Sequence, residues 1–367
     1  MARYYEGGKT PWVKSGELRE TVIHKTEENI TDDALKETNI KLVQPGAILL
    51  AMYGATVGRL GILGVPATTN QAVCHIIPAP ELADTRYVFH ALLAQVSRIT
   101  AKGVGGAQPN ISQGVIKELL VYLPSLVAQK RIAAILDKAD ALRAKRRKAL
   151  EQLDALAQAI FIEMFGDPTL NPKKWDVGSI GELLESASYG SSAKAGAEGS
   201  YPILRMGNIT NDGKIDLGDL KYIDLAEQEA EKYLVRAGDV LFNRTNSAEL
   251  VGKSAIYRFA DEVAYAGYLV RLRVNSKCDP EYLAAFLNTP HAKRVLRSMC
   301  KSIVGMANIN AKEVQSIRIA IPPIELQKEF GKRVRAIEGK RVFLEKSRGE
   351  LDALFSSLQH RAFRGEL

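Results

Sequence analysis

Asn110-Ile111, Pro124, Gln129-Lys130 and Leu153-Asp154-Ala155-Leu156 return further along the chain as Asn308-Ile309, Pro322, Gln327-Lys328 and Leu351-Asp352-Ala353-Leu354. Each residue of the second set lies 198 positions after its counterpart, both at the start (308 − 110) and at the end (351 − 153). A gapless register of this kind indicates an internal repeat, which has to be recognised before single elements because it decides the fold. The chain is therefore expected to contain two copies of one globular unit, each followed by a long helix.

The globular part of each copy has the pattern of a mixed α+β unit. A turn with Pro-Gly or Ala-Gly-Asp leads into a short apolar strand at residues 43–50 and again at residues 235–242. A second small element follows at residues 57–59 and 251–253. The spacing between the copies grows from 192 (235 − 43) to 194 (251 − 57) and then to 198, so the second copy carries short insertions inside its globular part. A helix is expected after Asp279-Pro280, with Asp279 as its N-cap and Asp84 in the same role in the first copy.

Two long helices are predicted behind the globular parts. The apolar or small residues that recur every three or four positions are Ile132, Ile135, Ala139, Leu142, Ala149, Leu153, Leu156 and Ile160 in the first copy, and Phe330, Val334, Ile337, Leu344, Leu351, Leu354 and Leu358 in the second. Gly166-Asp167-Pro168 ends the first stripe. Stripes of this spacing are typical of helices that pack on one another, and we expect an antiparallel coiled coil, a rod of roughly 50 Å.

These patterns predict four segments. The predicted segments are a first globular domain at residues 1–125, a long helix at 126–166, a second globular domain at 167–324 and a second long helix at 325–367. Trp175 lies 27 residues before Pro202 (202 − 175), whereas only ten residues precede Pro11, the matching proline of the first copy. The strand and loop that open the second copy are therefore expected to have no counterpart in the first.

Charge and composition narrow the class of protein. The net charge is +8, and most of the excess lies in the helical segments, where residues 126–165 carry 8 basic and 5 acidic side chains and residues 325–367 carry 10 and 7. A basic balance is often a footprint of nucleic-acid binding. No apolar run approaches the roughly 20 residues of a membrane span, and the three cysteines are widely spaced. Both observations favour a protein of the reducing cytoplasm.

Signatures of catalysis are not found in the sequence. Gly252-Lys253-Ser254 resembles the end of a phosphate-binding loop, but Ser247 stands where that loop needs a glycine. The five histidines are scattered without metal-ligand spacing. We therefore expect no catalytic activity, no metal and no cofactor in the chain itself.

The order of several short motifs is similar to that of a known family. These motifs are Trp12-Val13 with Gly16-Glu17-Leu18, Gly46-Ala47-Ile48-Leu49-Leu50-Ala51, Tyr53-Gly54-Ala55-Thr56-Val57-Gly58, Thr69-Asn70-Gln71-Ala72-Val73, Pro124-Ser125-Leu126 with Gln129-Lys130, Phe165-Gly166-Asp167-Pro168 and Phe363-Arg364-Gly365-Glu366-Leu367. Through them the chain resembles the specificity (S) subunit of type I restriction–modification systems along nearly its whole length. Each motif is weak alone, and the twofold recurrence makes the combination specific.

The resemblance implies a function. It implies two target-recognition domains that read the unlike halves of a split, asymmetric site in double-stranded DNA, with the helices as spacer. It also implies a non-catalytic subunit that joins modification (methyltransferase) subunits and, in the larger complex, restriction subunits. The complex carries the DNA adenine methyltransferase and endonuclease activities, and S-adenosylmethionine belongs to the methyltransferase subunits. A scaffold that carries two domains on a coiled coil and binds proteins only is the alternative.

Residues that could read bases are those whose donors and acceptors match base edges in the major groove. In the first copy the candidates are Arg59, Asn70, Gln71, Lys102 and Gln108-Pro109-Asn110, and in the second they are Arg205, Asn208, Asn243, Arg244, Thr245, Asn246 and Lys253. Each of them could instead be a turn residue or a surface hydrogen-bonder. Tyr53, Tyr265 and Tyr268 are expected to pack rather than to stack on bases. The basic run at residues 143–148 is interpreted as a solvated helix face, with phosphate contact or an acidic partner as the alternatives.

Overall fold

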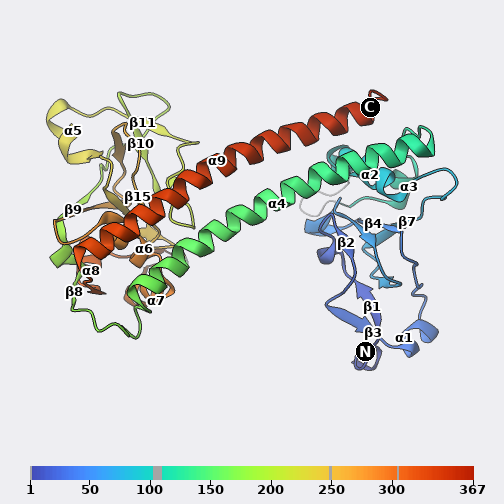
Figure 1. Cartoon of the computed structure of the whole chain (residues 1–367), viewed down its shortest axis with the longest axis horizontal. Coiled ribbons are helices and arrows are strands. Elements are labelled where there is room, and N and C mark those ends of the chain that lie inside the picture. The colour runs from blue at the N-terminus through green and yellow to red at the C-terminus, as the bar shows by residue number, and fades with distance from the viewer. Residues whose placement is uncertain (1, 102–109, 248–249, 304–305) are drawn as a thin grey trace. The chain divides into compact units, whose positions relative to one another are not determined.

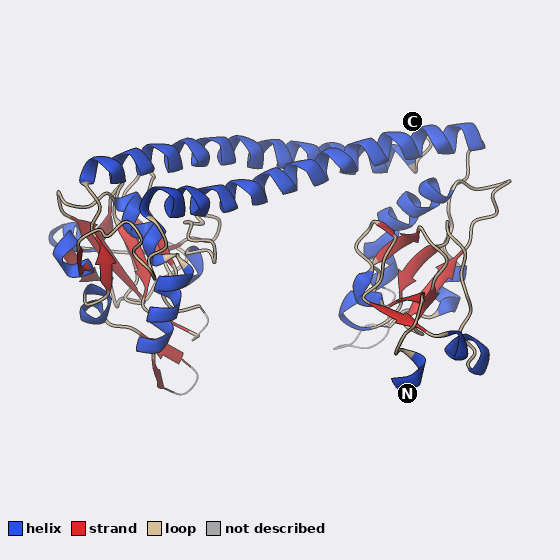
Figure 2. Ribbon diagram, turned by 60° about the horizontal axis from the view of Figure 1, so that its bottom comes forward, coloured by secondary structure: helices blue, strands red, loops and turns tan. Residues whose placement is uncertain are grey.

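The computed structural model describes residues 2–101, 110–247, 250–303 and 306–367. Within these ranges the chain divides into two compact units, unit 1 formed by Met1–Arg147 with Lys346–Leu367 and unit 2 formed by Lys148–Glu345. Figure 2 shows that the strands of each unit lie next to helices. Each unit is α+β, as the sequence predicts, and each is described by itself. The four segments predicted from the sequence separate the globular domains from the long helices, whereas the two units are defined by compactness. The division into four segments therefore stays a prediction.

Unit 1 has two small sheets and a helical cover. Its elements are η1 (Ala2–Tyr4), β1 (Thr10–Val13), η2 (Ser15–Glu17), β2 (Val22–Ile23), β3 (Glu28–Ile30), α1 (Asp32–Glu37), β4 (Ile48–Ala51), η3 (Gly54–Thr56), β5 (Leu60–Leu63), β6 (Thr68–Thr69), β7 (Val73–Ile76), α2 (Thr85–Ala101) and α3 (Gln113–Lys117). The strand orders are β3-β1-β6 and β2-β5-β4-β7. Ile48 and Leu50 of β4 form the core with Tyr87 and Leu92 of α2, so α2 covers one face of the four-stranded sheet.

Unit 2 repeats this plan with additional strands. Its elements are β8 (Val177–Ser179), η4 (Ile180–Leu183), β9 (Leu184–Tyr189), β10 (Tyr201–Leu204), η5 (Met206–Asn208), β11 (Lys221–Ile223), α5 (Glu227–Tyr233), β12 (Leu234–Val235), β13 (Val240–Asn243), β14 (Thr245–Asn246), β15 (Ser254–Ile256), β16 (Val263–Tyr265), β17 (Leu269–Val274), α6 (Pro280–Leu287), α7 (Pro290–Met299), β18 (Lys301–Ile303), β19 (Met306–Asn308), α8 (Ala311–Gln315) and β20 (Arg318–Ala320). The strand orders are β11-β10-β16-β12, β15-β13-β17-β9, β14-β19-β18 and β20-β8.

Matching hydrogen bonds align the two units residue by residue. The amide of Ile111 donates to the carbonyl of Met52, and the amide of Ile309 donates to the carbonyl of Arg244, both at 2.9 Å. The equivalences that follow from such pairs, unit 1 before unit 2, are Val13 and Leu204, Lys14 and Arg205, Ala51 and Asn243, Met52 and Arg244, Arg59 and Lys253, Asn70 and Ala266, Ala72 and Tyr268, and Asn110 and Asn308. The repeat seen in the sequence is thus a repeat of the backbone frame.

A buried glutamine explains why Pro and Gln recur in the repeat. In unit 1, Gln129 Oε1 accepts from the Asp84 amide at 2.8 Å, and Gln129 Nε2 donates to the Pro124 carbonyl at 2.8 Å. Gln327 makes the same two bonds in unit 2, with the Asp279 amide at 2.9 Å and the Pro322 carbonyl at 2.8 Å. Both side chains are fully buried, so either one, if lost, would leave buried backbone groups without partners. The glutamine ties the start of the long helix to the residue just before α2 in unit 1 and to the N-cap residue of α6 in unit 2.

The predicted long helices are α4 (Leu126–Phe165) and α9 (Ile324–Ala362). In both units a stretch of α4 lies beside a stretch of α9 (Figure 1). The predicted stripes are partly wrong, because Ile135, Leu142, Leu156 and Leu354 are exposed. The side chains that face inward are Ile132, Leu136, Ala139, Arg143, Arg146, Leu150, Leu153, Ala157, Phe161 and Met164 on α4, and Phe330, Val334, Ile337, Arg341, Leu344, Leu351, Phe355 and Ala362 on α9. Arginines occupy inward positions on both helices, which an apolar count does not detect.

The helix pair of each unit is held by different contacts. In unit 2 the ring of Phe161 meets those of Phe330 and Tyr282, each at a centroid distance of 5.7 Å. In unit 1 the Arg143 guanidinium lies 4.4 Å from the centre of the Phe355 ring and donates from Nε to Asp352 at 2.6 Å. The run at 143–148 is thus not wholly a solvated face, since Arg143 and Arg146 turn inward while Lys145, Arg147 and Lys148 are exposed.

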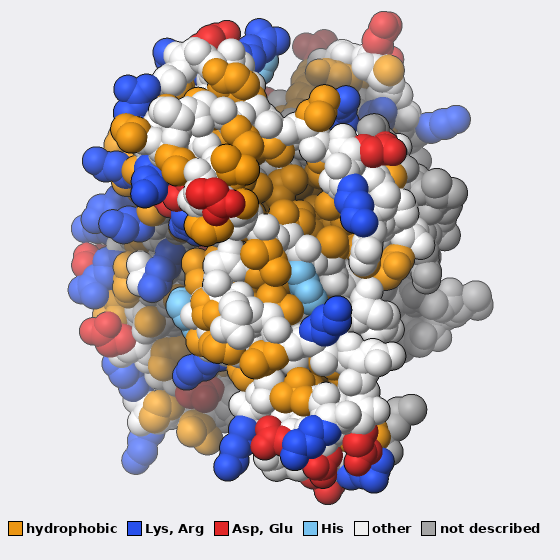
Figure 3. Space-filling model, turned by 90° about the vertical axis from the view of Figure 1, so that its right-hand side faces the viewer, with side chains coloured by type: hydrophobic (Ala, Val, Ile, Leu, Met, Phe, Trp, Pro, Cys, Tyr) orange, Lys and Arg blue, Asp and Glu red, His pale blue; other side chains and the backbone are white. Residues whose placement is uncertain are grey.

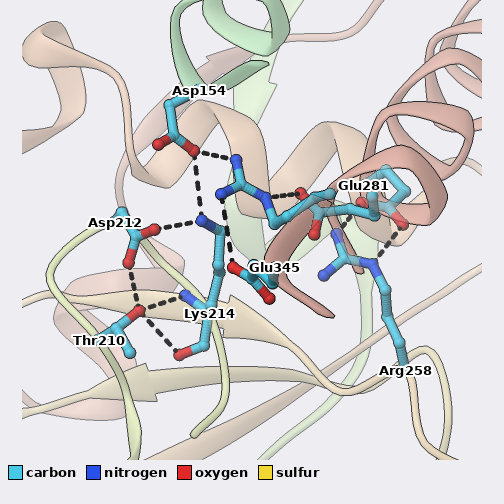
Figure 4. A network of polar contacts seen from close by, with 9 residues as sticks. Asp154, Thr210, Asp212, Lys214, Arg258, Glu281 and Glu345 are labelled. Carbon is cyan, nitrogen blue, oxygen red and sulfur yellow. Dashed lines mark hydrogen bonds and ion pairs between the residues drawn. The ribbon is translucent and has the colours of Figure 1, made fainter. Parts of the chain in front are cut away.

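A polar network fastens a loop of unit 2 to both helices (Figure 4). Asp154 of α4 binds Arg341 of α9 and accepts from Lys214 Nζ at 3.2 Å. Lys214 also pairs with Asp212, whose carboxylate accepts from the Thr210 hydroxyl at 2.5 Å. Arg341 is buried, and the carboxylates of Asp154, Glu338 and Glu345 lie within 4.0 Å of its guanidinium to balance its charge. Lys214 thus links the loop at residues 210–214 directly to α4, and through Asp154 to Arg341 of α9.

Candidate nucleic-acid interface

The largest concave site with predicted base-reading residues is a groove in unit 2 of about 1040 Å³. Its lining comes from strand ends and the segments that follow them, namely residues 191–195 after β9, residues 205–208 after β10, residues 244–245 after β13 and residues 266–268 before β17. Asn308 at the end of β19 completes it. Because strand ends of two sheets converge here, residues that lie far apart in the sequence face a common space.

Arg244 is the best-positioned cation of the groove. Its Nη2 donates to Asn308 Oδ1 at 3.0 Å, and its guanidinium carbon lies 4.9 Å from the centre of the Tyr189 ring. A guanidinium stacked on a ring and oriented by an amide presents a planar fork, which suits bidentate recognition of a guanine edge or a phosphate. Tyr268, half of whose surface is exposed, lines the same groove.

Arg205 faces the groove from the opposite strand end. Its Nη2 donates to the Asp219 carboxylate at 3.0 Å and to the Asp219 carbonyl at 3.0 Å. The pair is open to solvent, since the Asp219 side chain is 84% exposed, so its net contribution to stability is small. An anionic group that competes with Asp219 can therefore engage Arg205 at little cost.

Asn208 has a structural role. Its Oδ1 accepts from the Arg205 amide at 2.9 Å, and its Nδ2 donates to the Asp216 carbonyl at 2.9 Å. The side chain is 4% exposed and its hydrogen-bonding atoms are engaged within the protein. Asn208 therefore shapes the turn that presents Arg205, although it lines the groove.

The remaining candidates of unit 2 lie beside the groove or turn away from it. Thr245 lines the groove and is buried, and Asn246 Oδ1 accepts from the Ser247 amide at 2.9 Å. Asn243 is fully buried. Lys253 does not line the groove, and burial lowers its pKa. The structure thus brings Arg205, Asn208, Arg244 and Thr245 together, and the other three candidates lie outside the lining.

In unit 1 the equivalent positions carry other side chains. Met52 stands at the position of Arg244, and Lys14, the counterpart of Arg205, pairs with Glu28 at 2.9 Å and Glu27 at 3.2 Å. The candidates Arg59 and Gln71 are exposed. Asn70 is half-buried, and its backbone N–H donates to the Val13 carbonyl. Lys102, Gln108 and Pro109 lie outside the described residues, and Asn110 forms a β-bridge with Tyr53.

Lys194 and Asn308, which line the groove, and Tyr189, which stacks on Arg244, are not among the residues that the sequence singles out. The signal for Asn308 is its counterpart Asn110, a candidate of the first copy, whereas the contact of Tyr189 with Arg244 spans 55 positions (244 − 189) that no local pattern predicts. Of the three tyrosines expected to pack, only Tyr265 is fully buried, whereas Tyr53 and Tyr268 are 40% and 50% exposed.

Comparison with protein families decides the assignment. The family model described as type I restriction modification DNA specificity domain matches residues 2–152 and 172–350. The chain belongs to this family. The two matched segments correspond to the two copies of the repeat, so this protein has two DNA specificity domains.

Individual relatives agree with the family. The chain is 24% identical over 382 residues to the specificity subunit of the type I restriction enzyme EcoKI from Escherichia coli strain K12, which covers 97% of this chain and 81% of that relative. It is also 24% identical over 388 residues to the type I restriction enzyme MjaIX specificity subunit from Methanocaldococcus jannaschii, at 99% and 88% coverage. The crystal structure of a type I restriction–modification system S subunit from M. genitalium matches with a TM-score of 0.61 at 16% identity, covering 99% of this chain and 90% of that chain, and therefore shows the shared fold.

The described residues form neither a metal-binding cluster nor a helix that could span a membrane. No group of three or more His, Cys, Asp or Glu side chains is arranged there to hold a metal ion. None of the helices in that part of the chain combines the length and the apolar character that crossing a bilayer demands.

Proposed function

We propose that this specificity protein reads a bipartite, asymmetric site in double-stranded DNA, one half with each unit, and recruits methyltransferase and restriction subunits to it. The family assignment supports this function over a scaffold that binds proteins only. The observation that carries the proposal is the groove of unit 2, where Arg244 and Arg205 face a common space on a frame that unit 1 shares.

The difference between the units supports an asymmetric target. Unit 1 has Met52, Ala72 and Lys14 where unit 2 has Arg244, Tyr268 and Arg205. Side chains with such different donors cannot match the same base edges. We therefore propose that Arg205, Arg244 and Thr245 contact DNA in unit 2, with Asn208 in support, and that Arg59, Asn70, Gln71 and Lys102 contact it in unit 1. Asn246 and Lys253 are proposed to act at the rim of the unit 2 interface, whereas Asn243, which is fully buried, was wrongly predicted to contact DNA and belongs to the frame.

The long helices have the role of a spacer in this proposal. We propose that α4 and α9 pack as an antiparallel coiled coil that fixes the number of unread base pairs between the half-sites. The inward residues recur every three or four positions on α4 and every three, four or seven positions on α9, and Phe161–Phe330 and Arg143–Asp352 are contacts between the two helices within single units. A fixed register of this kind would hold the gap constant.

Catalysis is proposed to reside on the partners. The modification subunits would bind S-adenosylmethionine and methylate adenine, and the restriction subunits would cleave DNA, while this chain needs no cofactor of its own. The cytoplasm, where target DNA and partners meet, is the compartment that we propose.

Selection from a random double-stranded DNA library tests the proposal, with the methyltransferase subunit present. We expect enrichment of a motif with two unlike halves and one fixed gap. A library that shows no enrichment while the methyltransferase subunit is still bound would support the scaffold instead. Activity of the chain alone on DNA would contradict the non-catalytic role.

A further inference from the structure

Three cations of unit 2 lie together where α7 meets the turn before β15. Lys293 and Arg297 stand one helical turn apart on α7, and Lys253 directly precedes β15. Lys293 Nζ donates to the Gly252 carbonyl at 2.6 Å, which brings it next to Lys253. Leu296 of α7 packs against Gly252, where a Cβ atom would lie 2.7 Å from Leu296 Cδ1. Lys253, Lys293 and Arg297 are called the α7 cluster below.

The α7 cluster has no carboxylate to balance its charge among the described residues. Lys253 and Arg297 form no side-chain hydrogen bond and no ion pair there, and the partner of Lys293 is a carbonyl. Burial, together with the charges of Lys253 and Arg297, lowers the pKa of Lys293 to about 8. Like charges that are held together in this way favour the approach of an anion.

Other cations at the surface of the chain are paired with carboxylates. Lys14 of unit 1 binds Glu28 at 2.9 Å, and Arg236 of unit 2 binds Glu262 at 3.1 Å. Figure 3 shows basic and acidic side chains side by side at the lower end of unit 1. The α7 cluster departs from this pattern, so its charge points to a ligand from outside the chain.

Arg294 shows that the same helix also carries a balanced cation. Its Nη2 donates to the Thr169 hydroxyl at 3.2 Å. Hydrogen bonds from Thr169, and to a smaller extent the charge of Arg294, lower the pKa of Asp167. Arg294 is therefore engaged within the protein, and it serves as a matched control for Arg297.

The α7 cluster is continuous with the groove that contains Arg244. The Asn243 amide donates to the Lys253 carbonyl, and the Gly252 amide donates to the Asn243 carbonyl, both at 2.8 Å. Asn243 directly precedes Arg244, which lines the groove. The end of β13 and the start of β15 are neighbours in one sheet, so Lys253 and Arg244 lie at the same end of that sheet.

The corresponding place in unit 1 has other side chains. Gly58 is the counterpart of Gly252, and the side chains of α2 that lie against it are the neutral Val96 and Thr100. Arg59, at the place of Lys253, is exposed. At this place α2 thus presents neutral side chains where α7 brings cations, so the inference concerns unit 2.

We propose that the α7 cluster holds the phosphate backbone of DNA beside the half-site that unit 2 reads. Arg297 and Lys253 each contact one phosphate, and the more buried Lys293 adds positive charge at the same place. Such contacts position a protein on the duplex without carrying sequence information. This site rests on the proposed function, because it extends the same DNA interface. Its continuity with the groove favours DNA over an acidic protein as the ligand.

The salt dependence of DNA affinity tests this site in the assembled complex. One duplex carries the selected target, and the other has an unrelated sequence. Arg297→Gln with Lys253→Gln should reduce the slope of log affinity against log salt concentration by about 1.8, since each phosphate contact contributes about 0.9. The same relation gives a loss of affinity of roughly 30-fold at about 0.15 M salt. The loss should be equal on both duplexes.

Two control variants separate charge at this place from other effects. Arg294→Gln removes a charge from the same helix and should leave the slope and the affinity unchanged. Arg297→Lys with Lys253→Arg keeps both charges and should keep the slope, which a purely structural role of the two side chains would not predict.

Four outcomes would overturn the phosphate site. These are an unchanged slope in the double glutamine variant, an equal loss in Arg294→Gln, a loss confined to the target duplex, which would indicate base reading, and weaker binding of the methyltransferase subunit at an unchanged slope, which would assign the cluster to a protein partner. Failure of the proposed function is distinguishable from these. A complex that selects no bipartite motif, but whose slope still falls in the double variant, would contradict that function and support the phosphate site.

Discussion

Unit 1 and unit 2 share a frame and differ at the places where function is proposed. Gln129 and Gln327 make the same bonds to the starts of α2 and α6, and the backbone pairs around Met52 and Arg244 are the same. At the strand ends that surround the groove, however, unit 2 has Arg244 and Tyr268 at the positions where unit 1 has Met52 and Ala72. The comparison teaches that the groove side chains can change without disturbing the frame, which is what a protein needs if each unit reads its own half-site.

The largest expected effect concerns the turn η4 of unit 2, for which the described residues of unit 1 show no counterpart. Ile180→Ala with Leu183→Ala removes two fully buried side chains, and each substitution should cost about 2–5 kcal/mol of unfolding free energy. Hydrogen exchange should show loss of protection throughout unit 2 and little change in unit 1. Leu120→Ala in unit 1, where the side chain is 89% exposed, is the control and should change neither unit. Equal loss in both units would contradict the separate cores.

Substitution of the buried glutamines tests the shared frame. Gln129→Met and Gln327→Met each leave buried backbone groups without partners, at about 1–3 kcal/mol for each group. Urea titration followed by hydrogen exchange should show similar destabilisation, in unit 1 for the first variant and in unit 2 for the second. A large loss for one variant and none for the other would show that the two helix starts are held differently.

Arg244→Ala tests the reading groove. The loss of one good base contact is expected to cost about 1–3 kcal/mol of binding free energy, confined to the half-site of unit 2. Affinity should be measured at fixed salt in the assembled complex, against DNA with either half-site scrambled. Arg236→Ala is the control, because Arg236 pairs with Glu262 at 3.1 Å and does not line the groove. An equal loss for the control would indicate a general charge effect.

A smaller effect is expected in how the unfolding free energy of unit 2 depends on pH. Burial, with Lys253 and Arg297 nearby, lowers the pKa of Lys293 in unit 2 to about 8. Between pH 8 and the ordinary lysine value the unfolded chain binds more protons than the folded chain, so the unfolding free energy of unit 2 should rise with pH. We expect a rise of about 1–2 kcal/mol from pH 8 to 9.5.

Lys293→Met should abolish that rise, and Lys277→Met, which changes an exposed lysine of the same unit, should keep it. Denaturant titrations at several pH values, with hydrogen exchange to assign the unit, provide the measurement. A rise that persists in Lys293→Met would assign the pH dependence to another group.

Local signals in the sequence predicted the parts of the fold that are set locally. Asp84 and Asp279 cap their helices as expected, with side-chain oxygens that accept from the amides of Tyr87 at 3.0 Å and Glu281 at 2.9 Å. The existence of the long helices follows in the same way from periodicity, and the end of α4 from Gly166, whereas α9 ends at Ala362, before the predicted end at residue 367. The α+β class and the twofold repeat were visible for the same reason.

What the sequence did not predict depends on contacts between distant residues. The inward face of α9 includes Arg341, which a pattern of apolar residues leaves out. At the next turns the predicted stripe follows Leu354, which faces outward, instead of its neighbour Phe355, which faces inward. The groove needs the pairing of β10 with β16, which joins Leu204 to Tyr265, and the stacking of Arg244 on Tyr189. Neither has a local signature, so the candidates could be named but not sorted into those that meet and those that do not.

The most direct test of the central claim is a random-library selection with the assembled complex, run in parallel for the original chain and for Arg244→Ala. The account predicts two unlike half-sites with a fixed gap for the original chain, and for the variant a loss of base preference at positions of one half only. The other half and the gap should be unchanged. A variant that loses preference in both halves, or that selects the original motif in full, would contradict the claim that each unit reads its own half-site.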